Sequence, residues 1–253
     1  MRLNLTRMKQ IPILFAVLFM VFLLSASCDD GHIDDPVYDY GKDGYNVQIT
    51  GTFKRLDTWT GNYSIVAAAF SDESEYSLIQ KVLPSAATDS TTETVSLSNV
   101  SSHAQTIEIA VVNTLRKRIA TIYSYPIPNN QHPDDTIKIN VGELNVGMFG
   151  AINQFIFQGT GTNCARCHSN ADGAGHLDLT SENAYASLVN VAAYKDNTQT
   201  RIIPFDAANS FFYKVIKDGD ESISYSHTGL FTEDKYAVFL DIIASWINGG
   251  AKE

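Results

Sequence analysis

The stretch Cys164-Ala165-Arg166-Cys167-His168 sets the organisation of the C-terminal half of this chain. Two thiols three residues apart can add across the two vinyl groups of one haem and leave thioether bonds. The histidine that follows is then close enough for its imidazole to take an axial position on the iron. The spacing therefore predicts one covalent haem, held by Cys164 and Cys167, with His168 as an iron ligand.

The N-terminus has the layout of an export signal, which fits haem attachment outside the cytoplasm. Three basic residues precede the apolar run 11–24, and the small residues 25–27 come directly before Cys28. This apolar run is too short to cross a bilayer comfortably, so residues 1–27 are predicted to be a cleaved signal peptide. The cysteine after small residues resembles a bacterial lipoprotein signal, which implies that Cys28 carries lipid. The alternative is an ordinary signal cut nearby, which leaves a free thiol.

The charge of the chain is strongly acidic. Losing the three basic residues of the signal leaves 15 Lys and Arg against 28 Asp and Glu, a net charge of −13. Such a field disfavours nucleic acid and favours a basic redox partner. Acids and glycines after the lipid site predict that residues 28–44 form an acidic tether. These acids resemble a surface-export signal of lipoproteins, which favours the outer membrane or cell surface over the inner membrane.

The pattern of residues 45–145 predicts β-strands. Apolar and polar residues alternate over 47–53, 63–67, 95–97, 107–111, 119–123 and 137–141, with turn-prone clusters such as 57–62 and 126–135 between them. About seven short strands at this spacing predict an antiparallel, Ig-like β-sandwich. The fold class expected is thus two-domain, all-β and then all-α.

The period becomes helical after residue 145, which predicts a small helical domain over residues 146–253. Short helices are expected over 149–156 and from Ser181. Another is expected with Asn209 or Ser210 as its cap and its end at Asp218-Gly219. The last helix is the clearest, with Thr232 as its N-cap and Gly249-Gly250 after its end. One of its faces carries a single apolar stripe made of Tyr236, Phe239, Leu240, Ile243, Trp246 and Ile247.

Residues 145–253 resemble a small c-type cytochrome module, similar to those of Bacteroidetes and planctomycetes. The resemblance rests on a helix leading into the Cys-x-x-Cys-His motif, on a C-terminal helix ending at residues 246–251, and on the order of the segments 176–179, 188–190, 201–204 and 210–213. It implies one haem c, electron transfer as the activity, and a second axial ligand near the start of the last helix.

That second ligand is commonly a methionine in such modules, but no methionine follows the haem motif here. Met148 lies on the leading helix, where it is expected to be core. His227 occupies the expected place and is predicted as the sixth ligand, with His176, Tyr225 or water as alternatives. Arg201 is a candidate partner for a haem propionate, the alternative being a surface charge.

Two imidazoles on one iron predict an electron carrier rather than an enzyme, since they leave no open site for oxygen or peroxide. The alternative function is a surface binding or adhesion lipoprotein in which the haem is structural or sensory. Trp59 and Tyr63 are candidates for a sugar-stacking pair on an exposed strand face, although aromatic residues in a sandwich are more often core. A peroxidase would need an open axial site. A zinc site made of the same Cys and His residues would want a second, separate ligand pair, which the sequence does not show.

Overall fold

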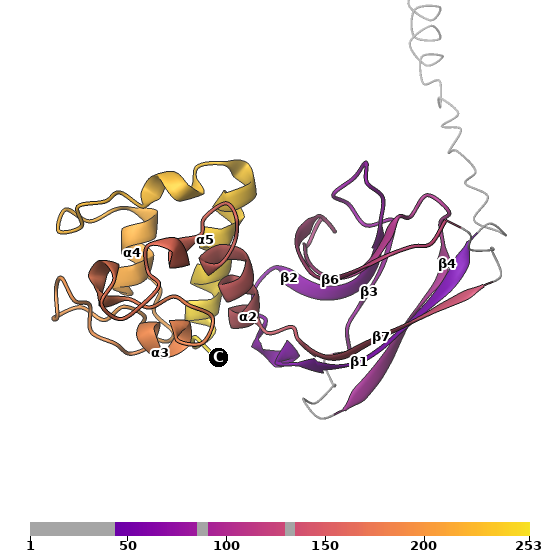
Figure 1. The fold of residues 1–253 in the computed structure, drawn as a ribbon, viewed down its shortest axis with the longest axis horizontal. Helices are drawn as coiled ribbons and strands as arrows, with labels where there is room; N and C mark the ends of the chain where they lie inside the picture. Colours follow the sequence, from indigo (N-terminus) through magenta and orange to yellow (C-terminus); the bar gives the residue numbers. More distant parts are fainter. Residues whose placement is uncertain (1–43, 85–90, 130–134) are drawn as a thin grey trace, which may run out of the picture. The chain divides into compact units, whose positions relative to one another are not determined.

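The computed structural model describes residues 44–84, 91–129 and 135–253 (Figure 1), which belong to one compact unit. The predicted signal peptide, the lipid site Cys28 and all of the predicted tether except Gly44 lie outside these residues. Within the described ranges, no helix combines the length and the apolar character that spanning a membrane requires. The chain is mostly β-sheet in its N-terminal part and helical in its C-terminal part.

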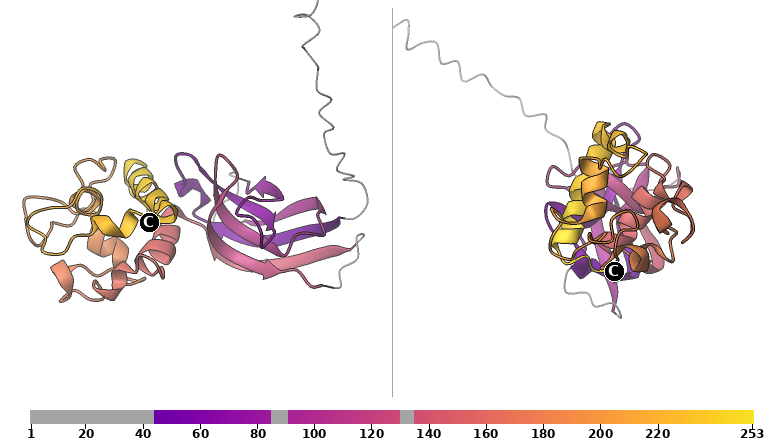
Figure 2. Two further views of the ribbon diagram at one scale, coloured as in Figure 1. Left: turned by 90° about the horizontal axis from the view of Figure 1, so that it is seen from above. Right: turned by 90° about the vertical axis from the view of Figure 1, so that its left-hand side faces the viewer.

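Seven strands form two sheets in the described part of the chain (Figures 1 and 2). The first sheet has the order β4-β1-β7, with β1 at Tyr45–Lys54, β4 at Thr92–Val100 and β7 at Thr136–Asn145. The second has the order β3-β2-β5-β6, with β2 at Tyr63–Phe70, β3 at Ile79–Val82, β5 at Thr106–Asn113 and β6 at Arg118–Pro126.

Both sheets contribute side chains to one buried core. Val47 and Ile49 of β1 belong to the same cluster as Ile65 of β2 and Ile107 and Ile109 of β5. These residues stand at alternate positions along their strands, so one face of each strand enters the core. The alternation therefore identified which residues are inside, as the sequence predicted.

One strand pairing differs from the predicted antiparallel arrangement. β1 pairs with β4 antiparallel but with β7 parallel, with Val47 opposite Ile137 and Ile49 opposite Ile139. The prediction was wrong here because alternation identifies the buried face of a strand and carries no information about its direction. The short strand β3, only four residues at the edge of its sheet, was also not predicted.

The second sheet is buried on both faces at its centre. Val66, Ala68 and Phe70 of β2 form a separate buried cluster with Ala110 and Val112 of β5. These residues alternate with those of the main core, so they lie on the opposite face. The continuous apolar run of residues 65–70 is typical of a strand covered on both sides.

The C-terminal part is built from short helices and turns. Its elements are α2 at Met148–Ile152, which continues as a π-helical turn at Asn153–Phe157, α3 at Ala184–Leu188, α4 at Phe211–Lys217 and α5 at Asp234–Asn248. Three 3₁₀ turns lie between them, at Cys164–Arg166, Ala174–His176 and Thr228–Phe231. The predicted leading helix and the helix from Ser210 to Asp218 are confirmed.

Helix α5 carries the main apolar stripe of this part. Phe239, Ile243, Trp246 and Ile247 are all buried in a cluster that also contains residues of α2, α3 and α4. The helix ends at Asn248, before Gly249-Gly250, as predicted. It begins at Asp234 with Glu233 as N-cap, so the prediction of Thr232 as N-cap was wrong. The Thr232 hydroxyl instead donates to the Gly229 carbonyl at 3.1 Å, closing the preceding turn.

Polar contacts join the strands to the helices. The indole Nε1 of Trp59 donates to the carbonyl of Val146 at 2.5 Å, and the Tyr63 hydroxyl donates to Asp241 of α5 at 2.6 Å. Both rings also pack against the helical core. Trp59 and Tyr63 therefore do not form a sugar-stacking pair on an exposed face; both are half-buried against the core, as the alternative prediction has it.

Candidate functional site

The Cys-x-x-Cys-His motif folds as a single tight turn. The chain reaches it through Gly159 and Gly161, where a side chain would collide with the Phe155 carbonyl and the Tyr236 ring. The amides of Cys167 and His168 then both donate to the carbonyl of Cys164, at 3.2 and 3.1 Å. Because one carbonyl closes the turn for both residues, the two thiols and the imidazole project from the same short segment.

The two thiols differ in their surroundings. Both cysteines are free, Cys164 half-buried and Cys167 exposed. Burial raises the pKa of the Cys164 thiol to about 12, helped by the nearby Cys167. The Cys164 sulfur also lies 3.7 Å from the carbonyl oxygen of Ile156. Cys164 is therefore a neutral thiol at physiological pH, held against the helical core.

The imidazole of His168 is oriented by its own loop. Its Nδ1 lies 2.8 Å from the carbonyl oxygen of Ala174, so Nδ1 carries the proton and Nε2 keeps its lone pair. The loop is closed again behind it, because the Leu179 amide donates to the His168 carbonyl at 2.7 Å. Burial lowers the pKa of His168, which favours the neutral imidazole that a metal needs.

His227 faces this ring from the turn before α5. The centroids of the His168 and His227 rings are 6.1 Å apart and their planes make an angle of 29°. Rings in face-to-face contact would be closer. An imidazole nitrogen lies about 1.1 Å from its ring centre and about 2.0 Å from a metal it binds, so two imidazoles on opposite sides of one metal have centres about 6.2 Å apart. The observed separation matches that value.

The surroundings of His227 also suit a ligand. Its Nδ1 is buried and, in the part of the chain that the structure describes, has no hydrogen-bond partner. A buried nitrogen without a partner costs free energy unless something binds it. Burial, with a further contribution from His168, lowers the pKa of His227, so this ring is neutral as well. The donor set, two thiols and two neutral imidazoles facing each other, fits a haem held as the sequence predicts.

The side chains considered as alternative ligands, and Met148, contact other residues and do not lie opposite His168. The ring of His176 packs on Tyr194 with centroids 3.9 Å apart. Tyr225 is exposed and meets His227 edge to face at 5.1 Å. Met148 is fully buried, and its sulfur accepts a weak hydrogen bond from Thr60 at 3.9 Å, which confirms it as core. Of these side chains, His227 is the one whose ring is opposite His168.

Arg201 is a buried clamp rather than a surface charge. Its side chain is among the few charged groups of the core, with the residue 7% exposed. One terminal nitrogen donates to the carbonyl of Ser187 at 2.7 Å, and the other donates to the carbonyls of Gly175 and His176 at 3.1 and 2.8 Å. Arg201 thus holds the turn next to Ala174, the residue that orients His168. Its pairing with a haem propionate stays a prediction.

The positioning groups around His168 were not predicted from the sequence. Ala174 and Ser187 act through backbone carbonyls. Every residue has such a carbonyl, so the residue type does not reveal this role. The only available signal was Arg201 itself, a cation between apolar residues 202–203 and a polar loop. A buried guanidinium needs several hydrogen-bond acceptors, so a buried arginine predicts backbone carbonyl partners. The sequence does not identify which residues supply those carbonyls.

The described residues contain no group of three or more His, Cys, Asp or Glu side chains placed to hold a metal ion by themselves. A tetrahedral zinc site takes four converging donors. What the structure shows instead is a facing pair of imidazoles beside two thiols.

No protein-family model, curated protein or solved structure matches this chain. The resemblance of residues 145–253 to cytochrome modules therefore stays a prediction from the residues quoted above.

Proposed function

We propose that this chain is a lipid-anchored, monohaem c-type cytochrome that carries electrons in the cell envelope. The observation that carries the proposal is the 6.1 Å separation of the His168 and His227 rings beside the thiols of Cys164 and Cys167. His168 and His227 are 59 positions apart in the sequence, so local structure does not set the distance between their rings. A shared metal would account for this spacing.

The residues of the site have distinct roles in this proposal. Cys164 and Cys167 would hold the porphyrin covalently, and His168 and His227 would be its axial ligands. A bound haem supplies one-electron chemistry between two oxidation states of its iron. The carbonyl of Ala174 keeps the Nδ1 proton of His168 in place, which increases the basicity of that ligand.

Two axial imidazoles support electron transfer over catalysis on a bound substrate. Ligation by both His168 and His227 would leave a haem iron without an open position, and its coordination would not need to change when its charge does. Imidazole also stabilises the oxidised iron more than a methionine would, so the reduction potential is expected to be low for a c-type haem. This arrangement makes peroxidase activity an unfavoured alternative.

The strands are proposed to form a sandwich that carries the haem domain. Trp59, Thr60 and Tyr63 make hydrogen bonds to Val146, Ser245 and Asp241, so the helices are fixed to the end of the β part. The lipid on Cys28 and the acidic tether would connect this unit to the membrane. The net negative charge would then attract a basic redox partner.

The test is the mass of the chain purified from a host with a haem-attachment system. We expect a gain of one haem that survives denaturation, and its loss in the double variant Cys164→Ala, Cys167→Ala. A zinc site would instead lose its metal on denaturation and leave the mass of the polypeptide. A wild-type chain that carries no covalent haem would contradict the proposal.

A further inference from the structure

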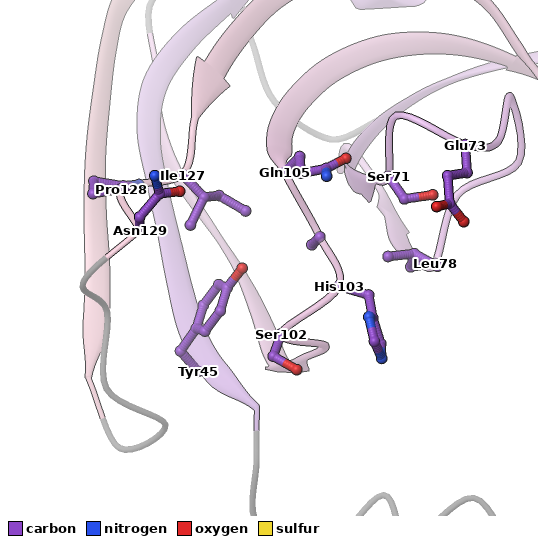
Figure 3. A pocket seen from close by; sticks show the side chains of 11 residues that line it. Tyr45, Ser71, Glu73, Leu78, Ser102, His103, Gln105, Ile127, Pro128 and Asn129 are labelled. Carbon is purple, nitrogen blue, oxygen red and sulfur yellow. The ribbon is translucent and has the colours of Figure 1, made fainter.

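A cavity in the β part is lined by residues of mixed chemistry, among them Glu73, Leu78 and His103 (Figure 3), and this lining selects no particular ligand. The two segments that carry the facing imidazoles differ in a way that bears on ligand binding. His168 lies in residues 164–179, the His168 segment, and His227 lies in residues 219–232, the His227 segment. The segment that is held less firmly is the one whose imidazole can leave a shared metal.

The His168 segment is bonded to other parts of the helical region. The side-chain amide of Gln158 donates to the Leu179 carbonyl at 2.6 Å, and the Arg201 guanidinium donates to two carbonyls in the middle of the segment. Within the segment, Nδ1 of His168 donates to the Ala174 carbonyl. These bonds join the segment to the rest of the chain and fix the orientation of its imidazole.

The His227 segment has fewer bonds to its surroundings. Among the described residues, each hydrogen bond that it makes has both partners within residues 219–232. Its attachment to the helical part is apolar: Phe231 is buried in the core there, and Ile223 and Leu230 are partly buried. A segment that is bonded mainly to itself opens at a low free-energy cost, so this segment is expected to move before the His168 segment does.

The imidazole of His227 is also less supported than that of His168. Its Nδ1 is buried but forms no hydrogen bond with any described residue. Burial and His168 lower the pKa of this ring, and the nearby Tyr225 carbonyl offsets part of that shift. The Tyr225 side chain meets the ring edge to face but is itself exposed. A hydrogen bond to the second nitrogen strengthens an imidazole as a ligand, so His227 is the weaker donor of the pair.

The surroundings of His227 select a neutral replacement for its imidazole. Residues 218–232 carry three carboxylates, on Asp218, Asp220 and Glu221, and no Lys or Arg. Their negative field disfavours an anion. A diatomic gas needs neither a counter-charge nor a hydrogen-bond donor, and it is small enough to enter where one imidazole withdraws.

We propose that His227 is the exchangeable ligand of the proposed haem site and that a neutral diatomic gas takes its place while His168 stays bound. In this exchange the bond from His227 to the iron breaks, and one bond from the iron to the gas forms. The iron keeps its charge and no proton is transferred. The inference rests on the proposed function, because it needs both imidazoles on one haem iron, and it adds gas binding to electron transfer.

The test mixes the dithionite-reduced, haem-loaded protein with carbon monoxide and follows the absorption spectrum. In the wild type and in the control His176→Ala, the observed rate should level off as the gas concentration rises, because the departure of His227 limits it. In His227→Ala the rate should instead rise in proportion to the concentration. Gly229→Ala should lower the plateau about two- to fivefold, because alanine restricts the conformations of the released segment. The added methyl group meets no atom within 4 Å, so the closed segment accommodates it.

Amide hydrogen exchange of the haem-loaded protein gives a second readout. The His227 segment should exchange at least about tenfold faster than the His168 segment. Equal protection of the two segments would overturn the inference. So would the absence of any absorption change under saturating carbon monoxide, a plateau that Gly229→Ala leaves unchanged, or displacement by azide in the oxidised protein without displacement by carbon monoxide in the reduced one. A wild-type iron that is high-spin before the gas is added would instead refute the proposed ligation itself, and the inference with it.

Discussion

Replacing Arg201 with methionine tests whether the buried guanidinium holds the loop that orients His168. Methionine keeps the aliphatic bulk but removes the hydrogen bonds to the carbonyls of Ser187, Gly175 and His176. Hydrogen bonds to a charged group contribute about 1.5–3 kcal/mol each, but Gly175 and His176 are exposed, so water can replace part of the loss. We expect the free energy of unfolding to fall by about 3 kcal/mol, or about 6–12 °C in melting temperature for a chain of this size.

The assay is thermal unfolding of the haem-loaded protein, followed by circular dichroism, together with its reduction potential. Arg201→Lys should recover only part of the stability, since an ammonium group cannot reproduce the fork of donors. The potential should rise in Arg201→Met, because a looser turn weakens the bond from His168 to Ala174 and lowers the basicity of the ligand. Arg116→Met, at an exposed arginine, should change neither quantity. Equal stability of Arg201→Met and Arg116→Met would refute the clamp.

Two further predictions concern the junction and the thiols. Trp59→Phe removes the bond to the Val146 carbonyl and should lower the free energy of unfolding by about 1–2 kcal/mol, measured by urea titration; no change would mean that the junction does not depend on this bond. In the haem-free chain at pH 8, iodoacetamide should modify Cys167 well before Cys164, as peptide mass mapping would show. Burial raises the pKa of Cys164 to about 12, so its thiolate and its labelling rate should increase as the pH rises towards that value; equal rates at pH 8 would contradict the burial.

Local patterns predicted the elements of the fold better than their assembly. The stripe on α5 and the buried positions of β1 and β5 follow from side-chain periodicity, which the sequence displays directly. The parallel pairing of β1 with β7 depends on how distant segments meet, which periodicity does not encode. The sequence left Trp59 and Tyr63 open between the core and an exposed face for the same reason, because periodicity does not show whether water or a helix covers an aromatic side chain.

In the candidate site, too, local patterns predict some residues, while contacts between distant segments could not be predicted. The spacing of the Cys-x-x-Cys-His motif predicts three of its residues, and the resemblance to cytochrome modules predicts His227 as a fourth. The structure brings the rings of His168 and His227 to 6.1 Å, and their role as haem ligands stays a prediction. The carbonyl of Ala174 and the clamp by Arg201 depend on backbone groups brought together by loop closure.

If His168 and His227 both ligate the iron of one haem, as we propose, the electron paramagnetic resonance spectrum of the oxidised protein will show it. The wild-type protein and His176→Ala are predicted to give the low-spin signal of two axial imidazoles. His227→Ala is predicted to lose that signal and show high-spin iron, while keeping the covalent haem. A low-spin spectrum that His227→Ala leaves unchanged would contradict the account.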